Sequence, residues 1–162
     1  MRSKIVLILG GIAIVVISFV TTLYMLRYFD EASTRDRRRR ADLATLQSAL
    51  EAYFKANGTY RVKGTGWHAL GAGYVDDRYD NATSVAEALY RGGYLSMPSI
   101  DDPDPGKRPN YMIFVCDPNQ YSISATLERP TASDAAHIQS TCNGTGSNGT
   151  YSTHGKNYAV GN

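Results

Sequence analysis

The side chains that most often carry out catalysis or bind metal ions are sparse and scattered in this sequence. His68, His137 and His154 show no HExxH pattern and no paired-ligand spacing. The stretch GTGWHALGAG does not fit the GxGxxG phosphate-binding pattern, and no Ser or Cys nucleophile has a recognisable base. We therefore expect no catalytic residues, no cofactor-binding residues and no metal ligands, and we do not expect an enzyme.

Three aspartates in a proline-broken loop come nearest to a metal site. The oxygens of Asp101, Asp102 and Asp104 could coordinate Ca²⁺, but their spacing lacks the EF-hand pattern. Solvated turn residues are the favoured interpretation, with a calcium site as the alternative.

The two cysteines, Cys116 and Cys142, have no CxxC or His-rich partner that would indicate a zinc or redox motif. A disulfide is the favoured interpretation, and two buried free thiols are the alternative. The bond would stabilise the fold by roughly 3 to 4 kcal/mol and requires an oxidising compartment. Four Asn-X-Ser/Thr sequons also favour an exterior location: Asn57, Asn81, Asn143 and Asn148.

Charge is concentrated in one basic run. The chain has 17 Lys plus Arg against 15 Asp plus Glu, so no overall basic field would attract nucleic acid. Arg37, Arg38, Arg39 and Arg40 are consecutive, and successive helical residues point about 100° apart, so they ring a helix and form no single DNA-reading face. Nucleic acid is not an expected partner. We expect the four arginines to form an exposed charged neck that serves assembly.

Residues 5–26 contain no charged side chain. As a helix they would span about 33 Å, which matches the roughly 30 Å hydrocarbon core of a bilayer. The pattern predicts a transmembrane helix. A cleaved secretory signal is the alternative, but its apolar region is usually about 7 to 15 residues long, so we expect the segment to be retained.

No Gly or Pro follows the span until Gly58, which predicts one helix from about residue 3 to Asn57. Its apolar face begins only at Leu43, so we expect residues 1–42 to form the transmembrane and protruding half and residues 43–162 to form a globular head. The face expected to pack in the head follows helical spacing: Leu43, Leu46, Leu50, Tyr53 and Phe54.

The remaining chain predicts one short helix and a few strands. SVAEALYRGGYL reads as a helix with a capping box at Ser84 and Glu87. YMIFVC and YSISATLE read as strands joined by a turn at 117–120, and the second alternates so that one face is core and the other is wet. A last strand is expected at 158–160 in an otherwise irregular tail. The fold class is α+β, a long N-terminal helix packed on a small antiparallel sheet.

Several segments together resemble type IV pilins and the pseudopilins of type II secretion. They are the apolar start, RDRRRRADLATLQSALEAYFKANGTY, ALYRGGYLSMPSIDDPDP, YSISATLE and NYAVGN. The resemblance covers most of the chain and is most specific between the arginine run and NGTY. It implies a ladle-shaped fold, in which the first half of the helix is a membrane anchor and later the filament core, and the second half packs on a small sheet.

The resemblance also implies a function and partners. The protein would be a structural subunit of a helical filament, homo-oligomeric or co-assembled with other pilins, with membrane lipid as its partner before assembly and the pilus or secretion machinery as its assembly partner. Family precursors carry a short charged leader ending in Gly and a glutamate five residues into the mature chain. Here Gly11 is followed by Ile12, and Val16 stands where that glutamate would be.

Two alternatives belong to other classes of protein. One is a single-pass, membrane-anchored extracytoplasmic binding domain that does not polymerise, which would need neither the leader nor the glutamate. The other is a nucleic-acid receptor that uses Arg37 to Arg40.

Two rules disagree on the orientation in the membrane. Arg2 and Lys4 precede the span and six arginines follow it, so the positive-inside rule alone would place the head in the cytoplasm. The cysteines and sequons favour the exterior. We expect the head outside the cytoplasm, and in a cell-surface filament after assembly, because acids lie among those arginines and form a local ion-paired cluster: Asp30, Glu31, Asp36 and Asp42.

Overall fold

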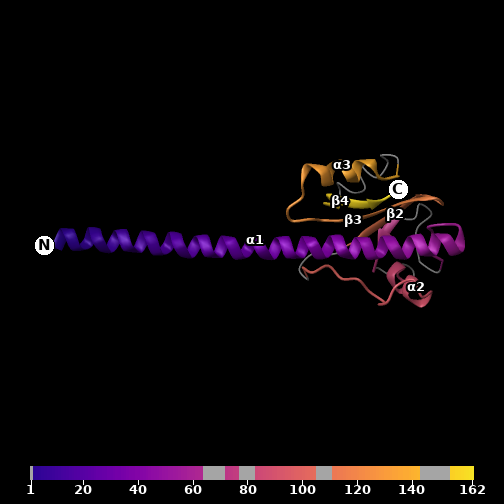
Figure 1. Cartoon of the computed structure of the whole chain (residues 1–162), viewed down its shortest axis with the longest axis horizontal. Helices are drawn as coiled ribbons and strands as arrows, with labels where there is room; N and C mark the ends of the chain where they lie inside the picture. The colour runs from indigo at the N-terminus through magenta and orange to yellow at the C-terminus, as the bar shows by residue number, and fades with distance from the viewer. Residues whose placement is uncertain (1, 64–71, 77–82, 105–110, 143–153) are drawn as a thin grey trace. The chain divides into compact units, whose positions relative to one another are not determined.

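A computed structural model describes residues 2–63, 72–76, 83–104, 111–142 and 154–162 (Figure 1). Within these residues, three helices and four strands follow one another in the order α1-β1-α2-β2-β3-α3-β4. The helices are α1 (Arg2–Asn57), α2 (Val85–Arg91) and α3 (Ala132–Ser140). The strands are β1 (Ala72–Tyr74), β2 (Met112–Asp117), β3 (Gln120–Ala125) and β4 (Tyr158–Gly161).

The chain forms two compact units that divide within α1, between Thr34 and Arg35. The first unit, Met1–Thr34, contains the first part of α1, and the second, Arg35–Asn162, contains the rest of α1 and all other elements. The sequence placed the boundary after residue 42. The division comes earlier because side chains between residues 35 and 40 bond to loops of the second unit, as described below.

The four strands form one antiparallel sheet in the order β1-β2-β3-β4. β2 and β3 form the central hairpin, with Ile113 opposite Ile123, and β4 pairs with β3 so that Val160 lies opposite Ile123. The hairpin turn is held by the Asn119 N–H, which donates to Asp117 Oδ1 at 2.7 Å. A long helix on a small antiparallel sheet is the predicted α+β class, and the layout is like that of the pilin fold.

One face of the sheet packs against α1. Within the second unit the sheet lies on one side of α1 and α2 on the other (Figure 1). The helix contributes the face expected from the sequence, with Leu43, Leu46, Leu50 and Tyr53 buried and Phe54 half-buried against them. The sheet and α2 contribute the rest of this apolar core: Ile113, Val115, Tyr121, Ile123, Ala125, Val85, Ala86 and Leu89.

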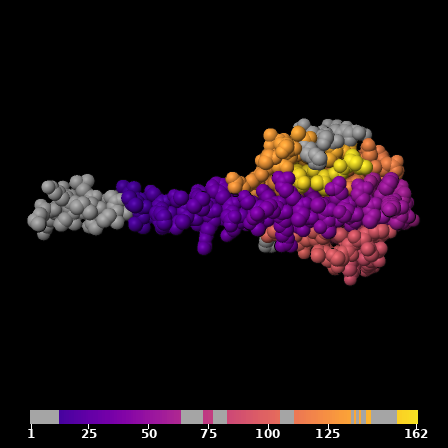
Figure 2. All heavy atoms as spheres, in the orientation of Figure 1, coloured from indigo at the N-terminus to yellow at the C-terminus, as the bar shows by residue number. Residues whose placement is uncertain are grey.

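Local signals end α1 and begin α2 at the positions that the sequence predicted. Gly58 follows α1 with φ +70°, and its N–H donates to Phe54 O at 2.7 Å, which ends the helix. Ser84 caps α2, because its side chain accepts the Glu87 N–H at 3.1 Å. Figure 2 shows the atoms of α2 and of the segment after it covering one side of α1.

The other face of the sheet is buried, where the sequence predicted a wet face. Ser122 and Ser124 have no exposed surface. Helix α3 covers this face, and its Ile138 packs with Ala159 and Phe114. The sequence did not predict α3, although Thr131 and Asp134 form a complete capping box at its start. It also missed the three-residue strand β1.

Candidate functional site

The first part of α1 exposes large apolar side chains. Among the described residues, α1 is the one helix that is long and apolar enough to cross a membrane, and it lies near the N-terminus. Large exposed apolar surfaces mark contact with lipid or with another protein. The side chains concerned are 45% to 69% exposed: Ile14, Val15, Val16, Ile17, Phe19, Val20, Leu23, Tyr24, Met25, Leu26, Tyr28 and Phe29.

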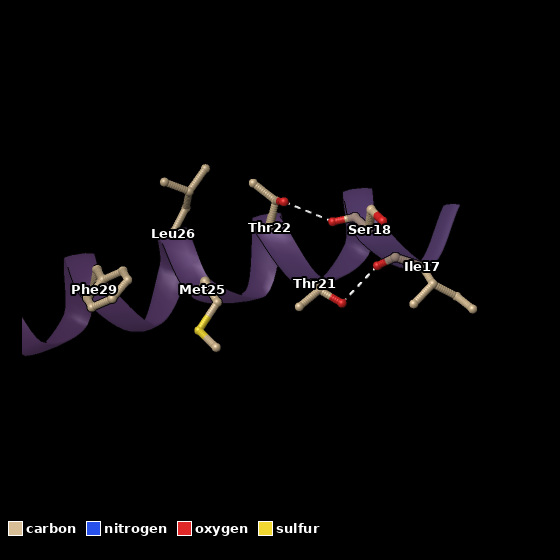
Figure 3. Close-up of a pocket in the computed structure, with 7 residues that line it drawn as sticks. All are labelled: Ile17, Ser18, Thr21, Thr22, Met25, Leu26 and Phe29. Atoms are coloured by element: carbon tan, nitrogen blue, oxygen red, sulfur yellow. Dashed lines mark hydrogen bonds between the residues drawn. The ribbon is translucent and has the colours of Figure 1, made fainter. Parts of the chain in front are cut away.

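Hydroxyl groups interrupt this apolar surface, but α1 itself satisfies two of them. Thr21 Oγ1 donates to Ile17 O and Thr22 Oγ1 donates to Ser18 O, both at 2.8 Å (Figure 3). Such bonds allow hydroxyls to lie in hydrocarbon without an unsatisfied donor. A shallow hollow of the helix surface is lined by these residues together with Met25, Leu26 and Phe29. It offers apolar contact and presents no charged group.

At the start of the second unit, Arg39 is fully buried. Its Nε and Nη2 donate to Asp102 Oδ2 and Oδ1 at 2.9 and 2.8 Å, and this bidentate pair joins α1 to the loop that follows α2. Its Nη1 donates to Asp36 Oδ1 at 2.9 Å and to Glu128 Oε1 at 2.8 Å. Arg35 forms a second bidentate pair with Glu128, at 2.7 and 2.8 Å. We call Arg35, Asp36, Arg39, Asp102 and Glu128 the arginine cluster.

The charges in the arginine cluster stabilise one another. Burial lowers the pKa of Arg39, but the hydrogen bonds to Asp102, Glu128 and Asp36 outweigh it and raise that pKa above its usual value. The pKa of Glu128 is lowered to about 2, mainly by the hydrogen bond from Arg35, with burial opposing and Arg39 adding to the effect. Both shifts favour the charged forms, so Arg39 and Glu128 are ionised at neutral pH, and loss of Arg39 would take away the cation that the buried acids around it share.

Asp36 ties α1 to the main chain of a distant loop. Its Oδ1 accepts the N–H of Glu128 at 2.9 Å, and its Oδ2 accepts the N–H of Arg129 at 2.8 Å. A carboxylate that accepts two backbone N–H groups fixes the position of the loop relative to α1.

Arg40 joins α1 to the start of α3. Its Nη1 and Nη2 donate to Asp134 Oδ1 and Oδ2 at 2.8 and 2.9 Å, and its guanidinium carbon lies 4.4 Å from the ring centroid of Tyr158. Cation–π contact of this kind favours a planar guanidinium over other cations. Arg40 is the largest cause that holds the pKa of Asp134 well below its usual range.

These contacts correct the predicted exposed neck at two of its four residues. Arg37 and Arg38 are exposed, but the Arg39 side chain is buried and that of Arg40 is 36% exposed. The physical reason is helical period: residues 36, 39, 40 and 43 share one side of α1, so the buried face continues into the run as charged residues that meet opposite charges. An assembly role for the four arginines stays a prediction.

Lys156, which comes just before β4, is a further buried cation. It is 9% exposed, and burial lowers its pKa to about 8, with the charge of Asp102 opposing this shift and that of Arg39 adding to it. The lysine therefore lies in the field of the arginine cluster. With a pKa of about 8, Lys156 loses part of its positive charge just above neutral pH, whereas Arg39 and Arg40 keep theirs.

Three tyrosines donate hydrogen bonds to acids of α1. Tyr60 and Tyr121 share Glu51, each with its hydroxyl 2.8 Å from a carboxylate oxygen, and Tyr111 donates to Asp42 at 2.7 Å. Burial first, and then the hydrogen bond to Glu51, raises the pKa of Tyr60 to about 12. All three tyrosines belong to the buried core of the second unit.

Cys116 and Cys142 form a disulfide, with their Cα atoms 5.9 Å apart, which confirms the predicted bond. It connects β2 to the segment directly after α3. Free thiols, the alternative, are thereby excluded.

The other candidates that the sequence offered are the loop aspartates, the histidines and the sequons. Both carboxylate oxygens of Asp102 already accept from Arg39, which weakens the calcium alternative at Asp101, Asp102 and Asp104. Within that part of the chain, no group of three or more His, Cys, Asp or Glu could hold a metal ion. The Tyr74 hydroxyl lies 2.8 Å from His154 Nδ1. The remaining candidates lie outside the described residues: His68, the side chain of His137, and the sequons at Asn81, Asn143 and Asn148.

The class that these features define is an α+β head on a long helix whose first part is suited to a membrane. Comparison with family models, with curated proteins and with solved structures finds no match for this chain. The layout is compatible with a membrane-anchored, pilin-like protein.

Proposed function

We propose that this protein is a structural subunit of a type IV pilus-like or pseudopilus filament and has no catalytic role. The observation that carries the proposal is that one helix, α1, combines an exposed apolar segment with a face buried in an α+β head. Lipid would cover the apolar segment before assembly. The same segments of neighbouring subunits would cover it in the filament.

Helix–helix packing would drive the assembly. In lipid, association of helices relies on close packing and polar contacts, because the hydrocarbon already covers apolar surface. The hollow at Ser18, Thr21 and Thr22 offers a close approach, and their small side chains would allow a neighbouring helix to lie near the backbone. Other copies of this chain, other pilins and an assembly machinery are the partners we propose.

The ion pairs of Arg35, Arg39 and Arg40 support a head outside the cytoplasm. The positive-inside rule counts Arg35, Arg39 and Arg40 as cytoplasmic signals, but in the folded head acids of the same unit pair with all three. The disulfide supports the same orientation, because such bonds persist in oxidising compartments.

The test is to examine material sheared from the surface of cells that express the full chain. The proposal predicts high-molecular-weight fibres that contain the protein and are visible by negative-stain microscopy. Expression of Val20→Arg provides a matched negative control, because it places a charge in the exposed apolar segment. Recovery of the native chain only as a detergent-soluble membrane monomer would overturn the filament.

One observation favours a second candidate, a membrane-anchored extracytoplasmic binding domain that does not polymerise. The hydroxyls of Thr21 and Thr22 are satisfied within α1, so that they need no neighbouring helix. Cysteine cross-linking at Ser18 separates the two candidates. Covalent dimers through Ser18→Cys would favour the filament, and exclusively monomeric protein in native membranes would favour the anchored domain.

A further inference from the structure

The two faces of the sheet make different contacts: the face toward α1 is apolar, whereas the second face, which α3 covers, includes buried serines. Buried aliphatic side chains from both sides, such as Leu43, Leu50 and Ile123, meet at the α1 face. On the second face, Ser122 and Ser124 are fully buried. The described apolar contact there consists of Ile138, Ala159 and Phe114.

The buried serines oppose the closing of α3. Ser122 Oγ finds a partner, because it donates to Thr141 Oγ1 at 2.9 Å. Ser124 Oγ has no hydrogen-bond partner among the described residues. In an open state both hydroxyls would be hydrated, and the burial of a hydroxyl without a partner is unfavourable. Contact between α3 and the sheet is therefore weakened by the residues beneath it.

Bonds at the two ends of α3 compensate for this polar surface. At its start, Asp134 pairs with Arg40, whose side chain is 36% exposed. At its end, the Cys116–Cys142 disulfide joins the chain to β2, and the Cys142 N–H donates to Asn162 O at 3.0 Å. Partly exposed ion pairs contribute little to stability, so the covalent bond is the stronger of the two attachments.

We propose that α3 is a redox-dependent cover. The disulfide keeps it on the second face of the sheet, and reduction lets it open while α1 and the sheet stay folded. In the opening step an external dithiol or phosphine supplies two electrons, the S–S bond breaks, and each sulfur takes a proton to form a thiol, while the reductant is oxidised. A newly made chain with reduced cysteines has an open cover, which closes after the cysteines are oxidised. This inference does not depend on filament formation.

Hydrogen exchange on the full chain in detergent micelles tests the proposal. The oxidised protein is compared with the same protein reduced by a phosphine under native conditions. We expect amides of residues 132–142 to exchange at least ~10-fold faster after reduction, and those of residues 43–57 to change by less than ~2-fold. Unchanged exchange in 132–142 would overturn the proposal. So would an equal loss of protection in 43–57, because the disulfide would then support the whole head.

A set of variants tests the part played by the buried hydroxyl. The double variant C116S/C142S should reproduce the exchange pattern of the reduced protein. Adding Ser124→Ala to it removes the unpartnered hydroxyl and should restore part of the protection of α3. Adding Ser48→Ala is the matched control, because Ser48 is exposed on α1 and its hydroxyl donates to Ala44 O. Equal exchange in both triple variants would overturn the role of Ser124.

Discussion

Arg39 and Asp102, 63 positions apart in the chain, form a bidentate ion pair with N–O distances of 2.8 and 2.9 Å. Neither side chain has more than 4% of its surface exposed. A pair this deeply buried gains Coulomb energy but loses the hydration of both ions. Its clearest effect is on specificity, because this bidentate pair forms only when the loop after α2 lies against this part of α1.

Removing Arg39 should cost far more stability than removing its neighbour. Arg39→Ala leaves the buried Asp102 without the guanidinium that bonds to both of its oxygens and removes one bond each from Asp36 and Glu128, so we expect a loss of about 3 to 5 kcal/mol in the free energy of unfolding. Arg38→Ala is the control, because the Arg38 side chain is 60% exposed and its pair with Asp42 should contribute less than about 1 kcal/mol. Chemical unfolding in detergent, followed by circular dichroism, measures both. Equal losses would contradict the structural role of the arginine cluster.

Acid should destabilise the head over a defined pH range. The pKa of Glu128 falls from an ordinary 4.5 to about 2 on folding, so its contribution is complete above pH 4.5 and is lost as the pH falls through 2. Asp134, whose pKa is also lowered, acts in the same direction. The variant Glu128→Gln should be less stable than the native chain at pH 6, with a difference that shrinks toward pH 2. A constant difference across that range would show that Glu128 is not the titrating group.

Alkali should act through the tyrosines that share Glu51. The pKa of Tyr60 rises from 10 to about 12 on folding, so its contribution is present below pH 10 and is lost as the pH rises through 12. Ultraviolet absorbance of tyrosinate should show delayed ionisation of Tyr60 and Tyr121, and Glu51→Gln should advance it. Because both hydroxyls bond to one carboxylate, the effects of Tyr60→Phe and Tyr121→Phe on stability should not be additive. Strict additivity would argue against the shared acceptor.

A charge in the exposed apolar segment should impair membrane integration. Val20→Arg is expected to cost about 2.5 to 3.5 kcal/mol in insertion free energy, since Arg at the centre of a spanning helix is unfavourable. Resistance to alkaline carbonate extraction measures integration, and Val20→Ala, an apolar change at the same position, serves as the control. If the Arg variant stays as firmly in the membrane as the Ala variant, the segment does not span the bilayer.

The two exposed arginines of the run should affect assembly without affecting the fold. In the double variant R37Q/R38Q we expect unfolding to change by less than about 1 kcal/mol, because both side chains are exposed. If the chain is a filament subunit, as we propose, the yield of sheared fibres should fall, because these two exposed charges would contact headgroups or acids of neighbouring subunits. Normal fibres from this variant would mean that the exposed part of the run is a solvated spacer.

Sequence patterns predicted those elements whose type can be recognised from the spacing of their own apolar residues. The spacing from Leu43 to Phe54 repeats with the helical period, and the alternation around Ile123 repeats with the strand period. α3 was missed because its polar, alanine-rich sequence has little apolar periodicity, although the Thr131 and Asp134 spacing is a capping signal that could have located it. β1 has only three residues, too few for any period to show.

The arginine cluster could not be predicted in full, because its acids are distant in sequence. Glu128 lies 93 positions from Arg35 and 89 from Arg39, and no local pattern links them. One signal was available: Asp36, Arg39 and Arg40 continue the helical face that begins with Leu43. Charged residues on an extended core face indicate buried partners, whereas the run taken as four equivalent arginines indicated an exposed neck.

The segment of α1 from Arg35 to Arg40 also determines how a pulling force would pass into the head. It is attached to three separate parts of the head, at residue 102, at residues 128–129 and at residue 134. Tension applied along α1 would be divided among these attachments in parallel, so no single bond would bear the whole load. Rupture would require several ion pairs to yield together, before the force reached the aliphatic contacts further along the helix.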